Sequence, residues 1–158
     1  MKTSPIRLLP LAAIALLAAC GPGADAPVPL EPKWSSLYAN YLKSCANCHA
    51  PGAPGRTSDI ETTLDFSTAA KGFASVGGSA AGLKGNQLAC NGVAFVVAGH
   101  PEKSLLVAAL DSPTRVAFTS GACDQDGITD ETVKQGAAPS AAWVAALKQW
   151  ISSGAANN

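Results

Sequence analysis

The sequence has little charge and almost no methionine. Only 14% of its 158 residues are charged, and eleven acidic side chains match eleven basic ones, with no basic block. Nucleic-acid binding depends on clustered Lys and Arg that neutralise phosphates, so this composition argues against it. The single methionine is Met1, so no thioether sulfur follows it in the chain. After residue 19 no apolar run approaches the roughly eighteen residues of a membrane-spanning helix.

The cysteine count limits the architecture further. Five cysteines are too few for a miniprotein held together by disulfides, and the odd number leaves at least one for another task. The length allows one domain, hardly two, with a core that buries about two-thirds of the unfolded chain's surface.

The N-terminal segment is typical of an export signal. Two basic residues precede an apolar run over residues 8–19, which is too short to span a bilayer comfortably, and small residues lead to Cys20. This order is similar to the lipobox of bacterial lipoproteins, in which the signal is cut before a cysteine that is then acylated. The resemblance implies a signal peptide over residues 1–19 and a lipid on Cys20; an ordinary secretory signal is the alternative. Gly21 follows the cysteine, rather than the aspartate that resembles an inner-membrane retention signal. We therefore expect the protein to be anchored in the outer membrane, facing the periplasm.

Proline and glycine divide the rest of the chain. Residues 20–32 contain four prolines and form a lipidated tether, residues 33–154 form the folded domain, and residues 155–158 form a flexible tail. Apolar residues recur at helical spacing in four places, so we expect an all-α domain with a Gly-rich mobile loop over 77–92. The expected helices are Trp34 to Cys45 or slightly beyond, Thr68 to Val76 begun by Ser67, one begun by Pro101 and closed by Pro113, and Ala141 to Ser152 with Ser140 as N-cap.

The motif Cys45-Ala46-Asn47-Cys48-His49 carries the chemistry. Two cysteines at this spacing can form thioethers to the two vinyl groups of one haem, and the next histidine presents its imidazole to the iron. Two other kinds of site use similar cysteine pairs. A thioredoxin-like pair needs a βαβ setting, and a zinc site needs a second ligand pair, and neither is visible in the sequence. The motif therefore predicts one covalent haem c, with His49 as its proximal ligand.

The flanking segments resemble a known arrangement. Leu64-Asp65-Phe66-Ser67, the stretch from Gly99 to Leu106, and the stretch from Trp150 to Ala155 are similar to class I c-type cytochrome-like domains of bacterial lipoproteins. The resemblance implies a small all-α cytochrome c-like fold around one haem, in which a C-terminal aromatic helix crosses the helix that carries the motif.

One departure from that family concerns the distal iron ligand. Class I cytochromes usually place a methionine ahead of the final helix, but residues 124–139 offer Gly127, Ile128 and the stretch 136–139 instead, and none of these side chains can ligate iron. His100 is the only other histidine and is a candidate distal ligand, although a surface or capping role for it is equally natural. An open or water-bound position and ligation by another group are the further alternatives.

Two cysteines and one acidic segment remain. In an oxidising compartment Cys90 and Cys123 most simply form a disulfide, and thiolate ligation of iron is the alternative. The segment Asp124-Gln125-Asp126-Gly127 is similar to half of a calcium loop, but Ala122 and Val133 stand where two key carboxylates are needed. We therefore expect a solvated turn leading to a helix cap at Thr129.

These observations predict a lipid-anchored, periplasmic monohaem cytochrome that carries single electrons rather than an enzyme. Its redox partner protein is unidentified, and we expect a monomer. The missing methionine leaves open a haem-based binder of NO, CO or peroxide, or a weak peroxidase. The third hypothesis is a degenerate cytochrome-like interaction module that holds no haem.

Overall fold

The computed structural model describes residues 29–56, 63–134, 136 and 138–158. The expected signal peptide, Cys20 and most of the tether lie outside these residues. The described part is all-α, with six α-helices, four 3-10 helices and no β-strand. In chain order these elements are α1 Trp34–Asn40, η1 Leu42–Asn47, α2 Ala69–Val76, η2 Gly85–Cys90, η3 Pro101–Lys103, α3 Leu105–Leu110, α4 Ser112–Ala117, η4 Gln125–Gly127, α5 Glu131–Lys134 and α6 Ala141–Ser152.

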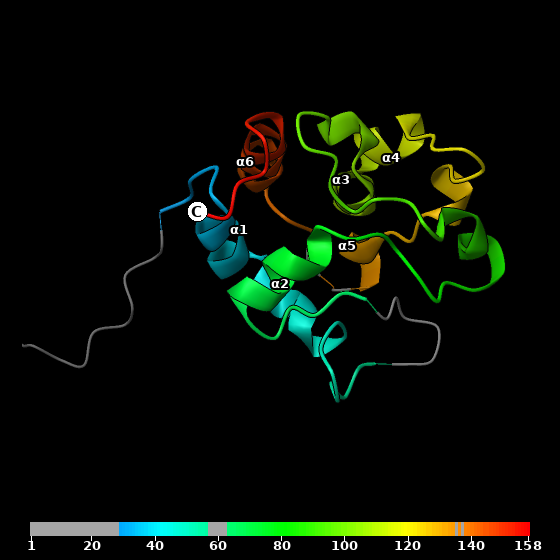
Figure 1. Ribbon diagram of the computed structural model, residues 1–158, viewed down its shortest axis with the longest axis horizontal. Coiled ribbons are helices and arrows are strands. Elements are labelled where there is room, and N and C mark those ends of the chain that lie inside the picture. The colour runs from blue at the N-terminus through cyan, green and yellow to red at the C-terminus, as the bar shows by residue number, and fades with distance from the viewer. Residues whose placement is uncertain (1–28, 57–62, 135, 137) are drawn as a thin grey trace, which may run out of the picture.

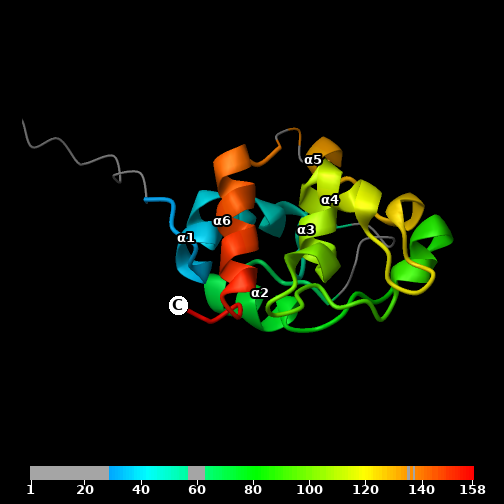
Figure 2. The ribbon, with the colours of Figure 1, turned by 90° about the horizontal axis from the view of Figure 1, so that it is seen from above.

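Tryptophans join the first and last helices. α1 packs beside α6 and against α2 (Figures 1 and 2). The Trp34 ring lies 5.3 Å from Trp150 and 5.7 Å from Phe73, and its indole N–H donates to the carbonyl of Ala69. The indole of Trp143 donates to the Leu37 carbonyl at 3.1 Å. Burial of large rings and satisfaction of their N–H groups thus fix the helix crossing.

The helix that precedes the motif is shorter than expected. It ends at Asn40, because Tyr41 takes a non-helical conformation (φ −152°), and a 3-10 helix over Leu42–Asn47 continues the chain. The start of α2 also differs by one residue: Thr68, not Ser67, is its N-cap and accepts a hydrogen bond from the Lys71 N–H. Such one-residue differences arise because adjacent hydroxyl residues can both cap a helix.

The expected third helix is divided. A 3-10 turn begins at Pro101, α3 covers Leu105–Leu110, and a further helix, α4, begins at Ser112. Pro113 was expected to close a helix, but it lies in the first turn of α4, where a missing N–H costs nothing. Asp111 caps α4 by accepting from the Thr114 N–H at 3.1 Å. The last helix, Ala141–Ser152 with Ser140 as N-cap, is confirmed.

The Gly-rich segment and the C-terminal tail, for which we expect mobility, both make hydrogen bonds to the rest of the domain. The Gly-rich segment contains η2, and Gly92 and Ala80 are joined by a backbone hydrogen bond of 2.8 Å. The C-terminal tail lies on the start of α1, because Asn158 accepts from the Trp34 N–H with its side chain and from the Ser35 N–H with its carbonyl. The tail thus supplies acceptors for helix N–H groups that have no partner within the helix, and its flexibility stays a prediction.

Among the described residues, no helix combines the length and the apolar character needed to cross a bilayer.

Candidate cofactor site

The motif residues lie at the end of η1, with their backbone closed into a tight turn. The N–H of His49 donates to the Cys45 carbonyl at 2.8 Å, and the N–H of Cys48 donates to the same oxygen at 3.1 Å. Leu42, fully buried one turn earlier, anchors this turn in the core. Cys45 and His49 are buried and Cys48 is half-buried, and within the described residues the two cysteines form no disulfide. The turn therefore gathers two sulfurs and one imidazole within five residues.

Phe66 contacts His49 through both its backbone and its ring. Its N–H donates to the His49 carbonyl at 2.7 Å, and its ring meets the imidazole edge-on, with centroids 6.3 Å apart and planes at 86°. The phenol of Tyr38 on α1 donates to the Phe66 carbonyl. Phe66 is thus a positioning residue that the resemblance alone did not assign.

Gly55 packs directly on the motif. Its N–H donates to the Asn47 carbonyl at 3.1 Å. A Cβ at this position would lie 2.7 Å from that oxygen and 2.8 Å from the Cys48 sulfur, closer than real Cβ contacts. Only glycine lets the backbone pass this close to Cys48. Nothing in the spacing of the motif residues predicts this contact with Gly55.

The motif forms part of the wall of a cavity of about 820 Å³. This volume lies in the upper range of small-molecule and cofactor pockets, which are apolar with a few polar groups. Most of the lining is apolar, and His49, Lys43 and Glu131 are its ionisable groups besides the thiols of Cys45 and Cys48 and the phenol of Tyr41. The apolar lining includes Leu64, Phe66, Ala80, Leu83, Phe95, Leu105, Leu106, Ala109, Leu110 and Ile128.

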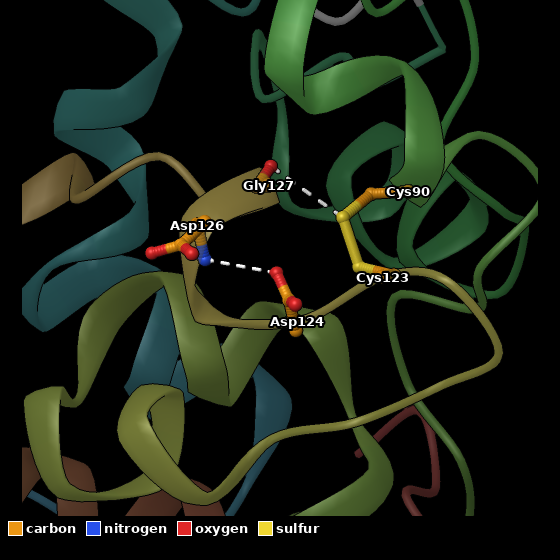
Figure 3. The surroundings of a disulfide bond; sticks show 5 residues. All are labelled: Cys90, Cys123, Asp124, Asp126 and Gly127. Atoms are coloured by element: carbon orange, nitrogen blue, oxygen red, sulfur yellow. Dashed lines mark hydrogen bonds between the residues drawn. A yellow bond between two sulfur atoms is a disulfide. The ribbon is translucent and has the colours of Figure 1, made fainter.

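One wall of the cavity comes from η4 and the residues that follow it. Gly127, Ile128, Thr129 and Glu131 all line the cavity. A disulfide between Cys90 and Cys123 ties this segment to η2, and the Cys90 sulfur lies 3.4 Å from the Gly127 carbonyl oxygen (Figure 3). The predicted pairing of these cysteines is present, and both are buried. We call this wall, residues 127–131, the clamped wall.

Arg115 provides the second attachment of the clamped wall. Its guanidinium pairs with the Asp130 carboxylate and also donates to the carbonyls of Ala108 and Ala109 at the end of α3, both at 3.3 Å. The pKa of Asp130 is lowered, chiefly by hydrogen bonds from Thr132, with burial opposing and the Arg115 charge assisting. Arg115 is a residue that the sequence reasoning missed, because its partner lies fifteen positions away in a loop.

His100 lies away from the cavity and is not brought together with the motif. Its side chain is 52% exposed, and Nδ1 lies 3.0 Å from the Glu102 carboxylate. It is not among the cavity-lining residues. In the structure His100 is thus a surface residue at the start of η3, which favours the surface interpretation of this position over distal ligation.

The acidic segment forms a turn. The Asp124 carboxylate accepts from the Asp126 N–H at 3.0 Å (Figure 3), and both side chains are exposed. Asp130, rather than the expected Thr129, accepts from the Thr132 N–H at 3.1 Å at the start of α5. In the described part of the chain, no three or more Asp, Glu, His and Cys side chains gather at one point to bind a metal ion.

Tyr41 lies between the motif and the last helix. Its ring packs on Trp143 with centroids 5.0 Å apart, and it lines the cavity. Burial raises the pKa of its phenol to about 12, with smaller contributions from Cys45 and the carboxylates of Glu131 and Asp130. The phenol is therefore protonated at neutral pH.

The donor set and the cavity fit a covalently attached haem. The cysteines and the histidine share one wall, and the rest of the lining offers the apolar surroundings that a porphyrin needs.

A scan against protein-family models finds no match for this chain, and searches of curated proteins and of solved structures find none either.

Proposed function

We propose that this protein is a lipid-anchored, periplasmic monohaem c-type cytochrome that carries single electrons, with a class I cytochrome c-like domain over residues 33–154. The observation that carries the proposal is the joint placement of Cys45, Cys48 and His49 in the wall of a large apolar cavity. A cysteine pair meant for redox exchange or zinc has no need of such a cavity beside it.

Each motif residue has a separate task in this proposal. Cys45 and Cys48 would hold the haem through thioethers, and His49 would be the proximal iron ligand. When bound, the haem supplies a one-electron couple between ferric and ferrous iron. The chain contributes positioning: Phe66 holds the His49 backbone and ring, and Gly55 leaves room beside the Cys48 sulfur.

The apolar lining sets the environment of the iron. Burial and low polarity around a haem are among the protein's controls of its reduction potential. Because the redox chemistry belongs to the cofactor and the cavity wall is mainly apolar, we assign the protein as a carrier rather than an enzyme. A redox partner protein, not a small substrate, would then receive the electron.

The location follows from the N-terminal segment. Cleavage after residue 19 and acylation of Cys20 would anchor the protein, and the proline-containing residues 20–32 would hold the domain off the outer membrane. Replacing Cys20 with Ala should abolish lipid attachment, measured as incorporation of labelled palmitate, while leaving haem attachment unchanged.

A haem-stained denaturing gel tests the central claim. The full chain, produced with the c-type maturation machinery, should give a stained band, and Cys45→Ala/Cys48→Ala should abolish it. His100→Ala is the matched control and should stain like the wild type, because its side chain lies outside the cavity. An unstained wild-type band would refute the proposal and favour the interaction module without haem.

A further inference from the structure

We infer that the iron held by His49 keeps its sixth coordination position open and binds a small neutral molecule, of the class of CO and NO, against the clamped wall at Ile128. This inference rests on the proposed function and deepens it, because it names a ligand for the same site. It follows from what each strong iron ligand of the chain is doing in the structure.

Histidine, methionine, cysteine thiolate and tyrosine are the common protein ligands of haem iron. Lysine also binds iron through its amine, but Lys43, the lysine of the cavity lining, is exposed and lies on η1, the element that carries the motif. Methionine occurs only at position 1. His100 is exposed and paired with Glu102 outside the cavity. Cys90 lines the cavity, but its sulfur is bonded to that of Cys123, so it offers no thiolate. Three of the four ligand types are therefore unavailable to the distal position.

Tyrosine is the fourth type, and Tyr41 is its representative in the cavity lining. Its ring is held against Trp143, and its residue directly precedes η1, the element that carries the motif. Tyr41 thus belongs to the part of the cavity wall that carries the motif.

The clamped wall offers little to the iron. Ile128, only 9% exposed, is apolar, and the neighbouring lining from α3, including Leu105 and Leu106, is apolar too. Thr129 and Glu131 add a hydroxyl and a carboxylate, neither of which is among the common ligands of haem iron. An apolar surface of this kind favours a neutral ligand, because an ion would lose its hydration without compensation.

The clamped wall is also fixed in place. The disulfide holds Gly127 beside Cys90, and Arg115 holds Asp130 against the end of α3. A Cβ at Gly127 would lie 3.1 Å from the Cys90 sulfur, which shows how closely the two segments pack. A distant ligand therefore cannot be brought to the iron by a simple shift of this segment.

The test uses the mature holoprotein and the probe CO. Haem staining first establishes whether haem is attached, and the ferrous protein is then titrated with CO while its absorption spectrum is recorded. We expect a five-coordinate ferrous spectrum that changes to a six-coordinate one on CO addition. Stained protein that is six-coordinate without CO, and unchanged by it, would overturn this inference and leave the proposed function standing. Unstained protein would overturn both.

Two substitutions at one position place the bound ligand. Ile128→Met puts a thioether in the clamped wall, and it should give a six-coordinate ferrous spectrum and weaken CO binding about tenfold if sulfur occupies nine-tenths of the iron. Ile128→Val removes one methylene from the same place and should keep CO affinity near that of the wild type. Equal CO affinities in Ile128→Met and Ile128→Val would overturn the assignment of the ligand to this wall.

His100→Ala tests whether the histidine outside the motif binds the iron. The variant should match the wild type in spectrum and in CO affinity, because the side chain is exposed. A gain of CO binding in this variant relative to the wild type would identify His100 as a ligand and overturn the inference.

Discussion

The two ends of the molecule are held together by different forces. At one end, which we call the aromatic half, α1, α2 and α6 pack through Trp34, Trp143, Trp150 and Phe73. At the other, the clamped half, η2, α4, η4 and α5 are tied by the disulfide and by Arg115. Figure 2 shows α3 between α6 and α4, so it joins the two halves.

This difference decides how each half responds to change. Burial is non-directional and spread over many contacts, so the aromatic half should lose stability according to the volume removed. The clamped half depends on a few individual links, so removing one link should loosen a whole segment. The cavity lies between these halves and has lining residues from both.

The largest effect should come from Trp34 in the aromatic half. Trp34→Ala removes a side chain that is 1% exposed and its indole hydrogen bond to Ala69, and should lower the free energy of unfolding by about 3–5 kcal/mol. Urea denaturation measures it. Trp34→Phe keeps most of the packing and should cost about half as much or less. Equal losses for the two variants would show that the hydrogen bond, rather than volume, stabilises this half.

The disulfide gives the corresponding test of the clamped half. Replacing Cys90 and Cys123 together with Ser opens a loop with a sequence separation of 33, and the loop-closure entropy relation predicts a loss of about 3–4 kcal/mol. Amide hydrogen exchange should accelerate most in η2 and residues 127–131 and least in α1 and α6. Uniform acceleration across both halves would contradict the comparison.

The aromatic half was largely predictable from the sequence. The spacing of Trp143, Leu147 and Trp150 gives α6 its buried face, and Ser140 marks its start. The all-α class, the placement of α2 and α6, and the local geometry of the motif follow from such short-range patterns. The end of α1 at Asn40 did not, because the 3-10 continuation keeps the same apolar residues buried as an α-helix would.

The clamped half was predictable only at its disulfide, which counting cysteines suggested. The pairing of Arg115 with Asp130 joins residues fifteen apart through tertiary packing, and neither residue stands in a recognisable pattern. The prediction that Pro113 closes a helix was wrong for a local reason, because a proline can end one helix and can equally occupy the first turn of another. His100 occupied a promising place in the sequence, but only three-dimensional structure reveals that it faces solvent.

Asp111 tests the joint between the halves through its charge. Its carboxylate caps α4 and lies 2.7 Å from the Lys148 ammonium on α6. Asp111→Ala loses both contacts and should cost about 2 kcal/mol. Asp111→Asn keeps a good cap and loses only the ion pair, which is partly exposed, so it should cost less than about 1 kcal/mol. Thermal unfolding of the two variants separates cap from charge.

The same carboxylate predicts a pH dependence. Burial works to raise the pKa of Asp111, but hydrogen bonds from Lys148 and Thr114 outweigh it and lower the pKa below its ordinary value of 3.8. A lowered pKa in the folded state means that the contribution is present above pH 3.8 and is lost as the pH falls through the folded value. Wild type and Asp111→Asn should therefore converge in stability below that pH, and a constant difference down to acid pH would contradict this assignment.

The smallest effect should come from Asn158, which closes the aromatic half. Its side-chain oxygen accepts from the Trp34 N–H at 3.0 Å, and its carbonyl accepts from the Ser35 N–H at 3.0 Å. Asn158→Ala removes only the first acceptor, so it should cost about 1 kcal/mol, as loss of a helix N-terminal acceptor does. Asn157→Ala is the matched control, since Asn157 is exposed, and should leave the urea midpoint unchanged. If both variants match the wild type, burial of the tryptophans alone sustains this half; if only Asn158→Ala falls, the aromatic half also depends on a point contact of the kind that holds the clamped half.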